Sequence, residues 1–267
     1  MTQPLERITR DTSPALRAEG ELRYAAVSEL VAEAALWVDL GCGTGVAAAD
    51  ALAGGFAAST LLVDRFGEAL ETASAELPRA EVLQADLATP DGLDAVRAAL
   101  AGAPEGPRVA TCFETIPHLE DFAGLVGLLI ELAEQHGFTV VLSVPNDAFW
   151  GIENPFHHTM WGEGAAQELR RLLPEDHVVM RQVPLAGSAL VAGATEWAPL
   201  PDPAADLRLA GVPSHVVVAF GPQAARLAPS AIVRGVDLDE QRRWERQRDS
   251  DLAFLEARVA ELERPAG

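Results

Sequence analysis

Short apolar runs alternate with amphipathic segments through the first half of the chain. The apolar runs are LWVDL, STLLVD, AEVLQAD, PRVATCF and FTVVLSV, and the amphipathic segments that separate them span 44–52, 68–77, 91–100 and 121–135. Runs of this length predict strands, and the segments between them predict helices with one apolar face. Strands that alternate with helices in this way form a parallel sheet that is buried on both faces. The pattern therefore predicts a doubly wound α/β domain.

Beyond this region, a helix predicted over 163–173 leads into two more apolar runs, at 177–183 and 214–221. We expect these two runs to form an antiparallel hairpin at the edge of the sheet, which then has seven strands. The Pro- and Gly-rich stretch 184–213 between them is longer than the loops of most compact domains, which favours a lid, a substrate wall or a dimer contact. Trp197 within this stretch favours packing over disorder.

A helix is also predicted at each end of the chain. Ser13 and Pro14 are typical of an N-cap and a first helical position, so a helix should continue from there to about Glu33. The charged segment 237–263 carries a narrow apolar seam made of Leu252, Leu255, Val259 and Leu262. Such a seam pairs with a second copy or docks back on the domain. The predicted organisation is an N-terminal helix (1–35), the α/β domain (36–221) and a C-terminal helical extension (222–267).

Composition narrows the classes of partner. The chain has 267 residues, of which 49% are hydrophobic, and a formal net charge of −20, so its surface should repel phosphate backbones and anionic membranes. We therefore expect neither a nucleic-acid nor a membrane partner. No apolar run approaches the roughly 20 residues of a membrane helix, and no signal-peptide core follows the N-terminus. Cys42 and Cys112 lack the spacing of a disulfide framework or metal site, which favours the cytoplasm.

The sequence VDLGCGTG, over Val38–Gly45, ends the first predicted strand in a glycine-rich turn. The residues of this turn are Gly41, Cys42, Gly43 and Gly45. Glycines let the backbone turn tightly and approach a ligand that a Cβ would exclude. The carboxylate of Asp39 suits a cofactor that carries an ammonium and a sulfonium, as S-adenosylmethionine does, better than a pyrophosphate. A nicotinamide fingerprint would also need a small residue where Val46 stands.

The next two predicted strands also end in carboxylates. Asp64, followed by Arg65, lies about 20 residues beyond the turn, where an acidic residue can accept both ribose hydroxyls. Asp86 and Leu87 follow the third strand, where they can hold an adenine amino group and pack against its ring. Ligands of doubly wound sheets bind at the carboxyl ends of the strands, so these residues should share one site.

The stretch 21–173 resembles class I S-adenosylmethionine-dependent methyltransferases, and among them the branch that tailors saccharides and small molecules. The motifs that carry the resemblance are LRYAAV, VDLGCGTG, LLVD, LQADL, FETIPHLEDF, SVPN and NPFHHTMW. The resemblance implies a Rossmann-like fold in which Arg23 and Tyr24 reach the methionine end of the cofactor. It further implies that Phe113 and Glu114 line the methyl-transfer face. The alternative is that Tyr24 is a core residue and Arg23 a solvated helix charge.

Methyl transfer from a sulfonium is an in-line displacement, so a hydroxyl acceptor must also lose its proton. Histidine is the residue best suited to take it near neutral pH. His157 and His118 follow the fifth and fourth strands and are the predicted catalytic residues, although His118 also suits a structural role in its loop. The other histidines, His136, His177 and His215, are expected on the surface or on strands far from the site.

No resident metal is predicted, but a metal-assisted reaction is an alternative. The residues Glu114, Asn146, Asp147 and His157 supply oxygen and nitrogen ligands of the kind that Mg²⁺ accepts. The leading hypothesis is O-methylation of a small molecule or saccharide, with a possible homodimer through the C-terminal helix or 184–213. The two alternatives are a non-catalytic cofactor-binding protein that docks partners through its C-terminal helix, and an NAD-dependent dehydrogenase.

Overall fold

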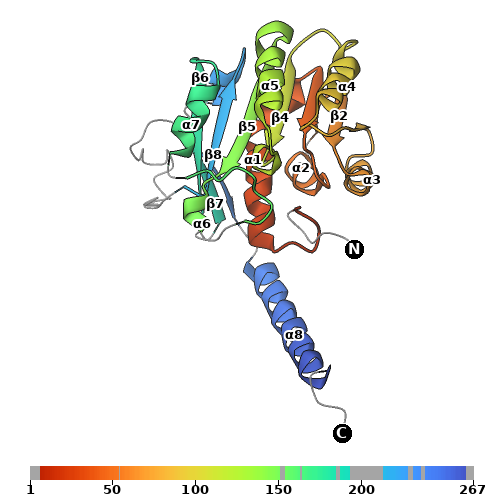
Figure 1. Cartoon of the computed structure of the whole chain (residues 1–267), viewed down its shortest axis with the longest axis vertical. Helices are drawn as coiled ribbons and strands as arrows, with labels where there is room; N and C mark the ends of the chain where they lie inside the picture. Colours follow the sequence, from red (N-terminus) through yellow and green to blue (C-terminus); the bar gives the residue numbers. More distant parts are fainter. Residues whose placement is uncertain are drawn as a thin grey trace.

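A single mixed sheet forms the centre of the molecule (Figure 1). The computed structural model describes residues 7–53, 55–150, 154–162, 164–184, 187–192, 213–227, 231–235 and 238–262. Its strands are β1 (Leu36–Leu40), β2 (Ser59–Asp64), β3 (Glu81–Gln84), β4 (Arg108–Phe113), β5 (Phe138–Pro145), β6 (His177–Pro184), β7 (Gly187–Ala192), β8 (His215–Phe220) and β9 (Ala231–Gly235). They hydrogen-bond in the order β3-β2-β1-β4-β5-β8-β6-β7-β9.

Helices cover both faces of this sheet. They are α1 (Pro14–Glu33), α2 (Val46–Ala51), α3 (Gly67–Glu76), α4 (Pro90–Leu100), α5 (Ala123–His136), α6 (Asp147–Trp150), α7 (Ala165–Leu172) and α8 (Leu238–Leu262), with 3-10 turns at Ile116–His118 and Ala224–Leu227. One apolar core joins the sheet to α4, α5 and α7, and a second joins its other face to α1, α2 and α3. Successive residues of a strand point into the two cores in turn. Val38 belongs to the first core, and Trp37, which is fully buried, belongs to the second.

The order in which strands are added to the sheet reverses between β1 and β4. From β1 the chain passes outward to β2 and β3, and it then returns to place β4 and β5 on the other side of β1. All of these pairs are parallel. Their carboxyl ends therefore meet at one edge of the sheet, and the point of reversal is where doubly wound folds place their ligand.

The predicted doubly wound α/β fold is confirmed, and the seven predicted strands are present. The sheet is two strands wider than predicted, because β7 lies inside the stretch 184–213 and β9 inside the predicted helical extension. Both strands are short and contain Gly and Ala, which have low strand propensity, but pairing with neighbours supplies their backbone hydrogen bonds. The antiparallel pairing of β6 with β8 is as predicted, although β9 takes the edge. The remainder of 184–213, including Trp197, lies outside the described residues.

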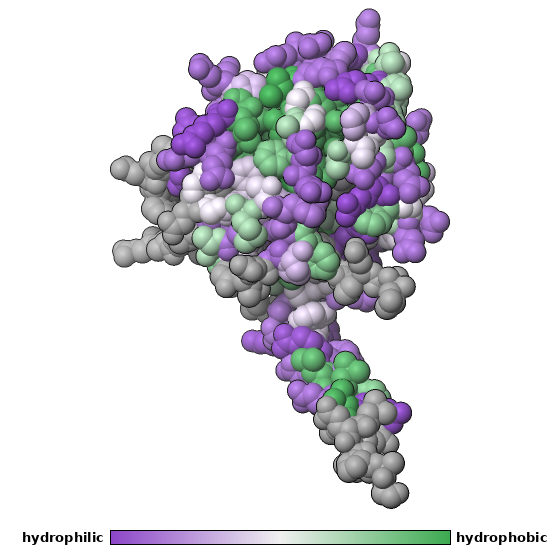
Figure 2. Space-filling view, viewed as in Figure 1, coloured by the Kyte–Doolittle hydropathy of each residue, from purple (hydrophilic) through white to green (hydrophobic). Residues whose placement is uncertain are grey.

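The two terminal helices begin and end close to the predicted positions. Ser13 caps α1 through a 3.3 Å hydrogen bond from the Leu16 amide to its hydroxyl, and Pro14 opens the helix. The last helix, α8, projects away from the sheet (Figure 1), and its outer part carries exposed apolar side chains (Figure 2). Among the described residues, no helix is both long and apolar enough to span a membrane.

Candidate active site

The glycine-rich turn after β1 adopts a left-handed backbone at all three glycines, with φ of 83° at Gly41, 56° at Gly43 and 71° at Gly45. A Cβ on Gly41 would lie 2.1 Å from Thr115 Oγ1, so the fold itself requires this glycine. At Gly43, by contrast, the nearest atom to an added Cβ is Arg7 Cδ at 4.0 Å. Gly43 is therefore the glycine that leaves room for a ligand against the backbone.

Asp64, at the end of β2, is tied to this turn. Its Oδ2 accepts a 3.0 Å hydrogen bond from the Gly43 amide, and its Oδ1 accepts one of 2.9 Å from the Phe66 amide. Arg7 lies 3.6 Å from the same carboxylate and 4.0 Å above the Phe66 ring, and the exposed Arg65 lies 4.5 Å from that ring. The carboxylate is thus held in place before any ligand arrives.

Asp39, at the end of β1, is buried and has a partner on each carboxylate oxygen. The Tyr24 hydroxyl donates to Oδ2 at 2.8 Å, and the Thr111 hydroxyl donates to Oδ1 at 2.6 Å. Burial raises the pKa of Asp39 to about 6, although both hydrogen bonds act to lower it. Tyr24 also packs edge-on against Phe113 at 5.0 Å, so it is both a core residue and a neighbour of the predicted cofactor site.

The remaining predicted cofactor residues lie close to the same turn or the same edge. Asp86 is half-buried and accepts a 3.0 Å hydrogen bond from the Ala88 amide, and Leu87 is buried in the first core. Cys42 is buried within the turn, and burial raises the pKa of its thiol well above the usual value, so it stays protonated. Because β1, β2 and β3 are adjacent and parallel, the three carboxylates follow one edge of the sheet.

Glu114 follows β4 in a left-handed conformation that is uncommon for a residue other than glycine, with φ of 56°. The Ser143 hydroxyl donates to its Oε1 at 2.5 Å, and His215 Nε2 lies 3.4 Å from its Oε2. Burial acts to raise the pKa of Glu114, but His215, Arg23 and the Ser143 hydrogen bond together hold it below its usual value. Glu114 is therefore a carboxylate at neutral pH.

His215 was predicted to lie far from the site, and that prediction is wrong. It is the first residue of β8, which runs antiparallel to β5, so the start of β8 lies beside the carboxyl end of β5. Burial lowers the pKa of His215 to about 4, so its ring is neutral. Its Nδ1 lies 2.9 Å from the Ser214 hydroxyl and 3.8 Å from Glu19 Oε2.

Arg23 is also buried, with 5% of its surface exposed, so the alternative that it is a solvated helix charge is wrong. Its Nη1 donates a 3.0 Å hydrogen bond to Gln182 at the end of β6, whereas its Nε is buried with no partner in the described part of the chain. Glu19, one helical turn earlier on α1, likewise has a buried Oε2 with no hydrogen-bond partner there. Burial raises the pKa of Glu19 to about 7.

The two predicted catalytic histidines lie together beyond β4 and β5, with ring centres 5.0 Å apart. His157 has Asp147 Oδ1 at 3.1 Å from its Nδ1 and Asn154 Nδ2 at 3.1 Å from its Nε2. His118 Nδ1 lies 3.1 Å from the Phe156 carbonyl. These contacts hold the segment after β5 in place, and a role for either ring in proton transfer stays a prediction.

The magnesium alternative gains no support from these contacts. Asp147 uses both of its oxygens, one with His157 and one as acceptor of a 2.6 Å hydrogen bond from the Trp161 amide. Glu114 instead faces Ser143 and His215. Within the described ranges, no group of three or more His, Cys, Asp or Glu side chains is arranged to hold a metal ion.

Sequence reasoning missed Glu19 and Gln182 as members of the site. A signal for Glu19 was available, because it stands one turn before Arg23 and on the apolar side of α1 with Leu22. Charged residues at such positions are buried only when they are paired or bind something. Gln182 gave no such signal, since a single amide in a strand has no distinctive spacing.

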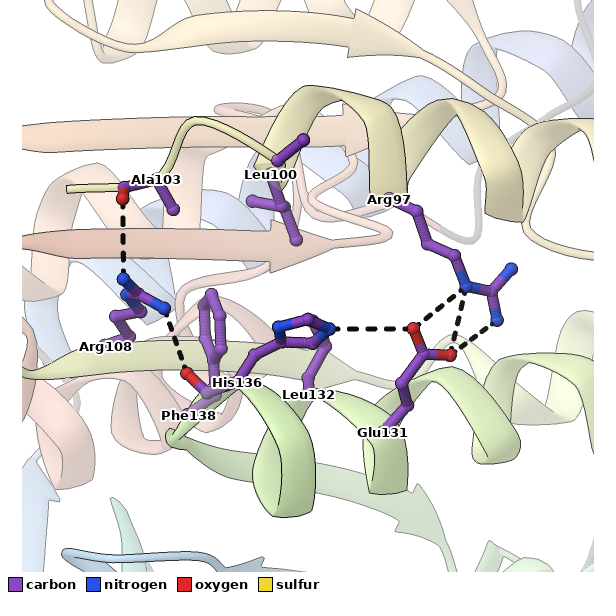
Figure 3. Close-up of a pocket in the computed structure, with 9 residues that line it drawn as sticks. Arg97, Leu100, Ala103, Arg108, Glu131, Leu132, His136 and Phe138 are labelled. Carbon is purple, nitrogen blue, oxygen red and sulfur yellow. Dashed lines mark hydrogen bonds and ion pairs between the residues drawn. The ribbon is translucent and has the colours of Figure 1, made fainter. Parts of the chain in front are cut away.

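A pocket of about 250 Å³ lies elsewhere, at the amino ends of β4 and β5 (Figure 3). Its polar groups pair with one another: Arg97 with Glu131, and Arg108 with the carbonyls of Ala103 and His136. None of the predicted site residues lines it. It is therefore separate from the carboxyl edge, where the candidate site lies.

Comparison with known proteins gives structural likenesses only. No protein-family model matches the sequence, and no curated protein matches it. The chain is similar in structure to the methyltransferase domain of bacterial CtHen1-C (22% identity, TM-score 0.49, 76% of this chain and 100% of that one). It is also similar to a SAM-dependent methyltransferase from Archaeoglobus fulgidus (14%, 0.49, 76% and 93%) and to the plantazolicin methyltransferase BamL in complex with SAH (10%, 0.46, 77% and 84%). Similarity at this level assigns no function, so the function is inferred from the site residues.

Proposed function

We propose that the protein transfers a methyl group from S-adenosylmethionine to a hydroxyl of a small molecule or saccharide. The observation that carries this proposal is the row of Asp39, Asp64 and Asp86 along one sheet edge, beside a turn in which Gly43 is open. A carboxylate at each of three neighbouring strand ends matches the ammonium, ribose and adenine groups of that cofactor.

The residues present fit the cofactor group by group. Asp64 would accept the ribose hydroxyls, Asp86 would take the adenine amino group, and Asp39 would face the ammonium. Arg23, whose Nε is buried without a partner in the described residues, supplies a donor for the methionine carboxylate or for a neighbouring acceptor group. When bound, the cofactor supplies an electrophilic methyl group, and the protein supplies alignment and a proton acceptor.

The charge of the site favours a sulfonium nucleoside over a dinucleotide. Asp39 is buried at the start of the turn, and with a pKa of about 6 it is mostly ionised at neutral pH. A buried carboxylate attracts an ammonium and repels a pyrophosphate at short range. The net charge of −20 extends the same preference to the acceptor, because an anionic polymer would be repelled from the surface.

Calorimetric titration with S-adenosylhomocysteine and, separately, with NAD tests the proposed donor. We expect saturable binding of S-adenosylhomocysteine and none of NAD, together with a rise in melting temperature for the first ligand only. Binding of NAD without binding of S-adenosylhomocysteine would instead support the dehydrogenase alternative. The histidine candidates His157 and His118 are tested separately, once methyl transfer is measured.

A further inference from the structure

A cluster of four polar side chains lies next to the proposed cofactor site, and binding of the methyl donor does not account for all of its members. It consists of Glu19 and Arg23 on α1, Glu114 after β4 and His215 at the start of β8, and we name it the Glu19 cluster. Two of its buried atoms, Glu19 Oε2 and Arg23 Nε, have no hydrogen-bond partner in the described residues. Folded proteins seldom leave such atoms bare, and a bound ligand is one way to satisfy them.

The place of the Glu19 cluster fits an acceptor. Tyr24, the residue after Arg23, hydrogen-bonds to Asp39 on the cofactor side, so α1 serves both groups of residues. Glu114 follows β4, which pairs directly with β1. The cluster therefore borders the proposed methyl-donor site on the side of β4, β5 and β8, and an acceptor bound there would lie beside the methyl donor, as the transfer requires.

We propose that the Glu19 cluster binds a hydroxyl group of a neutral, polyhydroxylated acceptor and that Glu19 is the catalytic residue that takes its proton. This proposal rests on the proposed methyl transfer. The two unpartnered atoms are an acceptor on Glu19 and a donor on Arg23. A hydroxyl donates and accepts at once, so hydroxyl groups complement both kinds of atom, whereas an ammonium group only donates.

The chemical step balances with the groups present. The acceptor oxygen forms a bond to the methyl carbon as the carbon–sulfur bond breaks, and the electron pair of that bond remains on sulfur. The hydroxyl proton passes to Glu19 Oε2, which later returns it to solvent. Removing this proton makes the oxygen a better nucleophile in the transition state.

The charges around Glu19 suit this role. Burial, supported by the carboxylate of Glu114 and opposed by Arg23, raises the pKa of Glu19 to about 7, which is close to ideal for a general base. His215 is neutral, because burial lowers its pKa to about 4, with Glu114 opposing this effect and Arg23 and His157 adding to it. Glu114 keeps its charge, since its pKa lies below the usual value. Glu19 is thus the member of the cluster that exchanges a proton near neutral pH.

The experiment follows a labelled methyl group from S-adenosylmethionine to three panels of acceptors: neutral glycosides, phenols and primary amines. The variants are Glu19→Gln and Glu19→Asp, the rivals His157→Asn and His118→Asn, and the control Glu29→Gln, an exposed carboxylate on the same helix. We expect label in the glycosides. Glu19→Gln should lower kcat about 100-fold or more, which is the usual contribution of a general base, and Glu19→Asp should retain part of the rate.

The dependence of kcat on pH and the affinity for S-adenosylhomocysteine, measured for each variant, distinguish loss of a general base from loss of cofactor binding. In the wild type and in Glu29→Gln, kcat should rise through a pKa near 7, and in Glu19→Gln this rise should be lost while affinity for S-adenosylhomocysteine is kept. The proposal is overturned if Glu19→Gln keeps kcat within threefold, if only His157→Asn or His118→Asn removes the rise, or if no glycoside is labelled. Failure of the wild type to bind S-adenosylhomocysteine would overturn the proposed function itself.

Discussion

We call the region around the carboxyl ends of β1, β2 and β3 the cofactor half of the site and the Glu19 cluster, with the neighbouring ends of β4, β5 and β8, the acceptor half. The two halves differ in where their polar side chains find partners. In the cofactor half, both oxygens of Asp39 and of Asp64 accept hydrogen bonds from the chain itself. In the acceptor half, Glu19 and Arg23 keep buried atoms without partners in the described residues. The first half is organised before any ligand binds, whereas we propose that a bound acceptor completes the second.

The largest expected effect comes from substituting glycines of the glycine-rich turn, where Gly41 is required by the fold and Gly43 leaves room for a ligand. Gly41→Ala places a Cβ 2.1 Å from Thr115 Oγ1 at a φ of 83°, so we expect a loss of unfolding free energy. The left-handed strain and the clash together amount to about 3 kcal/mol. Gly43→Ala carries only the strain, about 1 kcal/mol, because the nearest atom of the described residues, Arg7 Cδ, lies 4.0 Å from its added Cβ.

Urea denaturation and titration with S-adenosylhomocysteine measure this pair of variants. Gly43→Ala should retain its fold and lose affinity, because the added Cβ occupies the space left open for the ligand. Equal destabilisation of the two variants, or unchanged affinity in a folded Gly43→Ala, would contradict the assignment of Gly43 to the ligand.

The substitution Asp64→Asn is expected to have a smaller effect, a loss of affinity for S-adenosylhomocysteine. The amide keeps one acceptor oxygen for the Gly43 or Phe66 amide but cannot offer an anionic oxygen to both ribose hydroxyls. We expect affinity for S-adenosylhomocysteine to fall about 30-fold, which corresponds to about 2 kcal/mol. Asp94→Asn, at a side chain 73% exposed in a surface pair with Arg97, is the calorimetric control and should bind normally. Normal binding by Asp64→Asn would remove the carboxylate row as the basis of the proposed function.

The role of Glu19 can also be tested without an acceptor molecule, through the pH dependence of the unfolding free energy. The pKa of Glu19 is about 7 in the folded protein and near its usual 4.5 in the unfolded chain. The folded state therefore holds this proton more tightly, and the wild type loses stability as pH rises from about 4.5 through 7. Glu19→Gln has no such loss. Its stability relative to the wild type should increase by on the order of 2 kcal/mol between pH 5.5 and 8.5.

Urea denaturation at both pH values measures this change in relative stability. The stability of the control Glu29→Gln, on the same helix, should follow that of the wild type at both pH values. A gap between wild type and Glu19→Gln that is the same at both pH values would mean that Glu19 does not titrate with a raised pKa. The proton acceptor would then have to be sought at His157 or His118.

The same contrast explains what the sequence alone could predict. The strand and helix pattern, the VDLGCGTG turn and the carboxylates that end the first three strands are local features, so neighbouring residues along the chain predict them. The Glu19 cluster joins residues 19, 114 and 215, which only the packing of α1 and the antiparallel course of β8 bring together. No spacing along the chain records such contacts.

The strands β7 and β9 were not predicted from the sequence for a related reason. Their sequences, GSALVA and AIVRG, are short and rich in Ala and Gly, and pairing with β6 and with each other determines their structure. The two candidate histidines, His118 after β4 and His157 after β5, were found from sequence. Their hydrogen bonds to Asp147, Asn154 and the Phe156 carbonyl were not, because they depend on how the segment 147–161 folds back.

The smallest effect on stability is expected in α8, which belongs to neither half of the edge. It touches the domain near its first turns, where Glu240 pairs with Arg17 and the Trp244 indole donates to the Asp11 carbonyl at 3.0 Å. Farther out, Leu252 and Leu255 are 50% and 56% exposed. Substituting both with Ser should change the unfolding free energy by less than about 0.5 kcal/mol, because these side chains are exposed in the single chain.

A homodimer through α8 stays a prediction, and this double variant tests it by sedimentation. A second copy that covered these exposed leucines would shield them from water, so a dimer held by this seam should dissociate in the variant. Affinity for S-adenosylhomocysteine should stay the same, because the residues of both halves of the edge lie on the domain. If dissociation also weakened cofactor binding, α8 of one copy would have to support the site of the other. The site would then consist of the two halves of the edge together with α8 of the second copy.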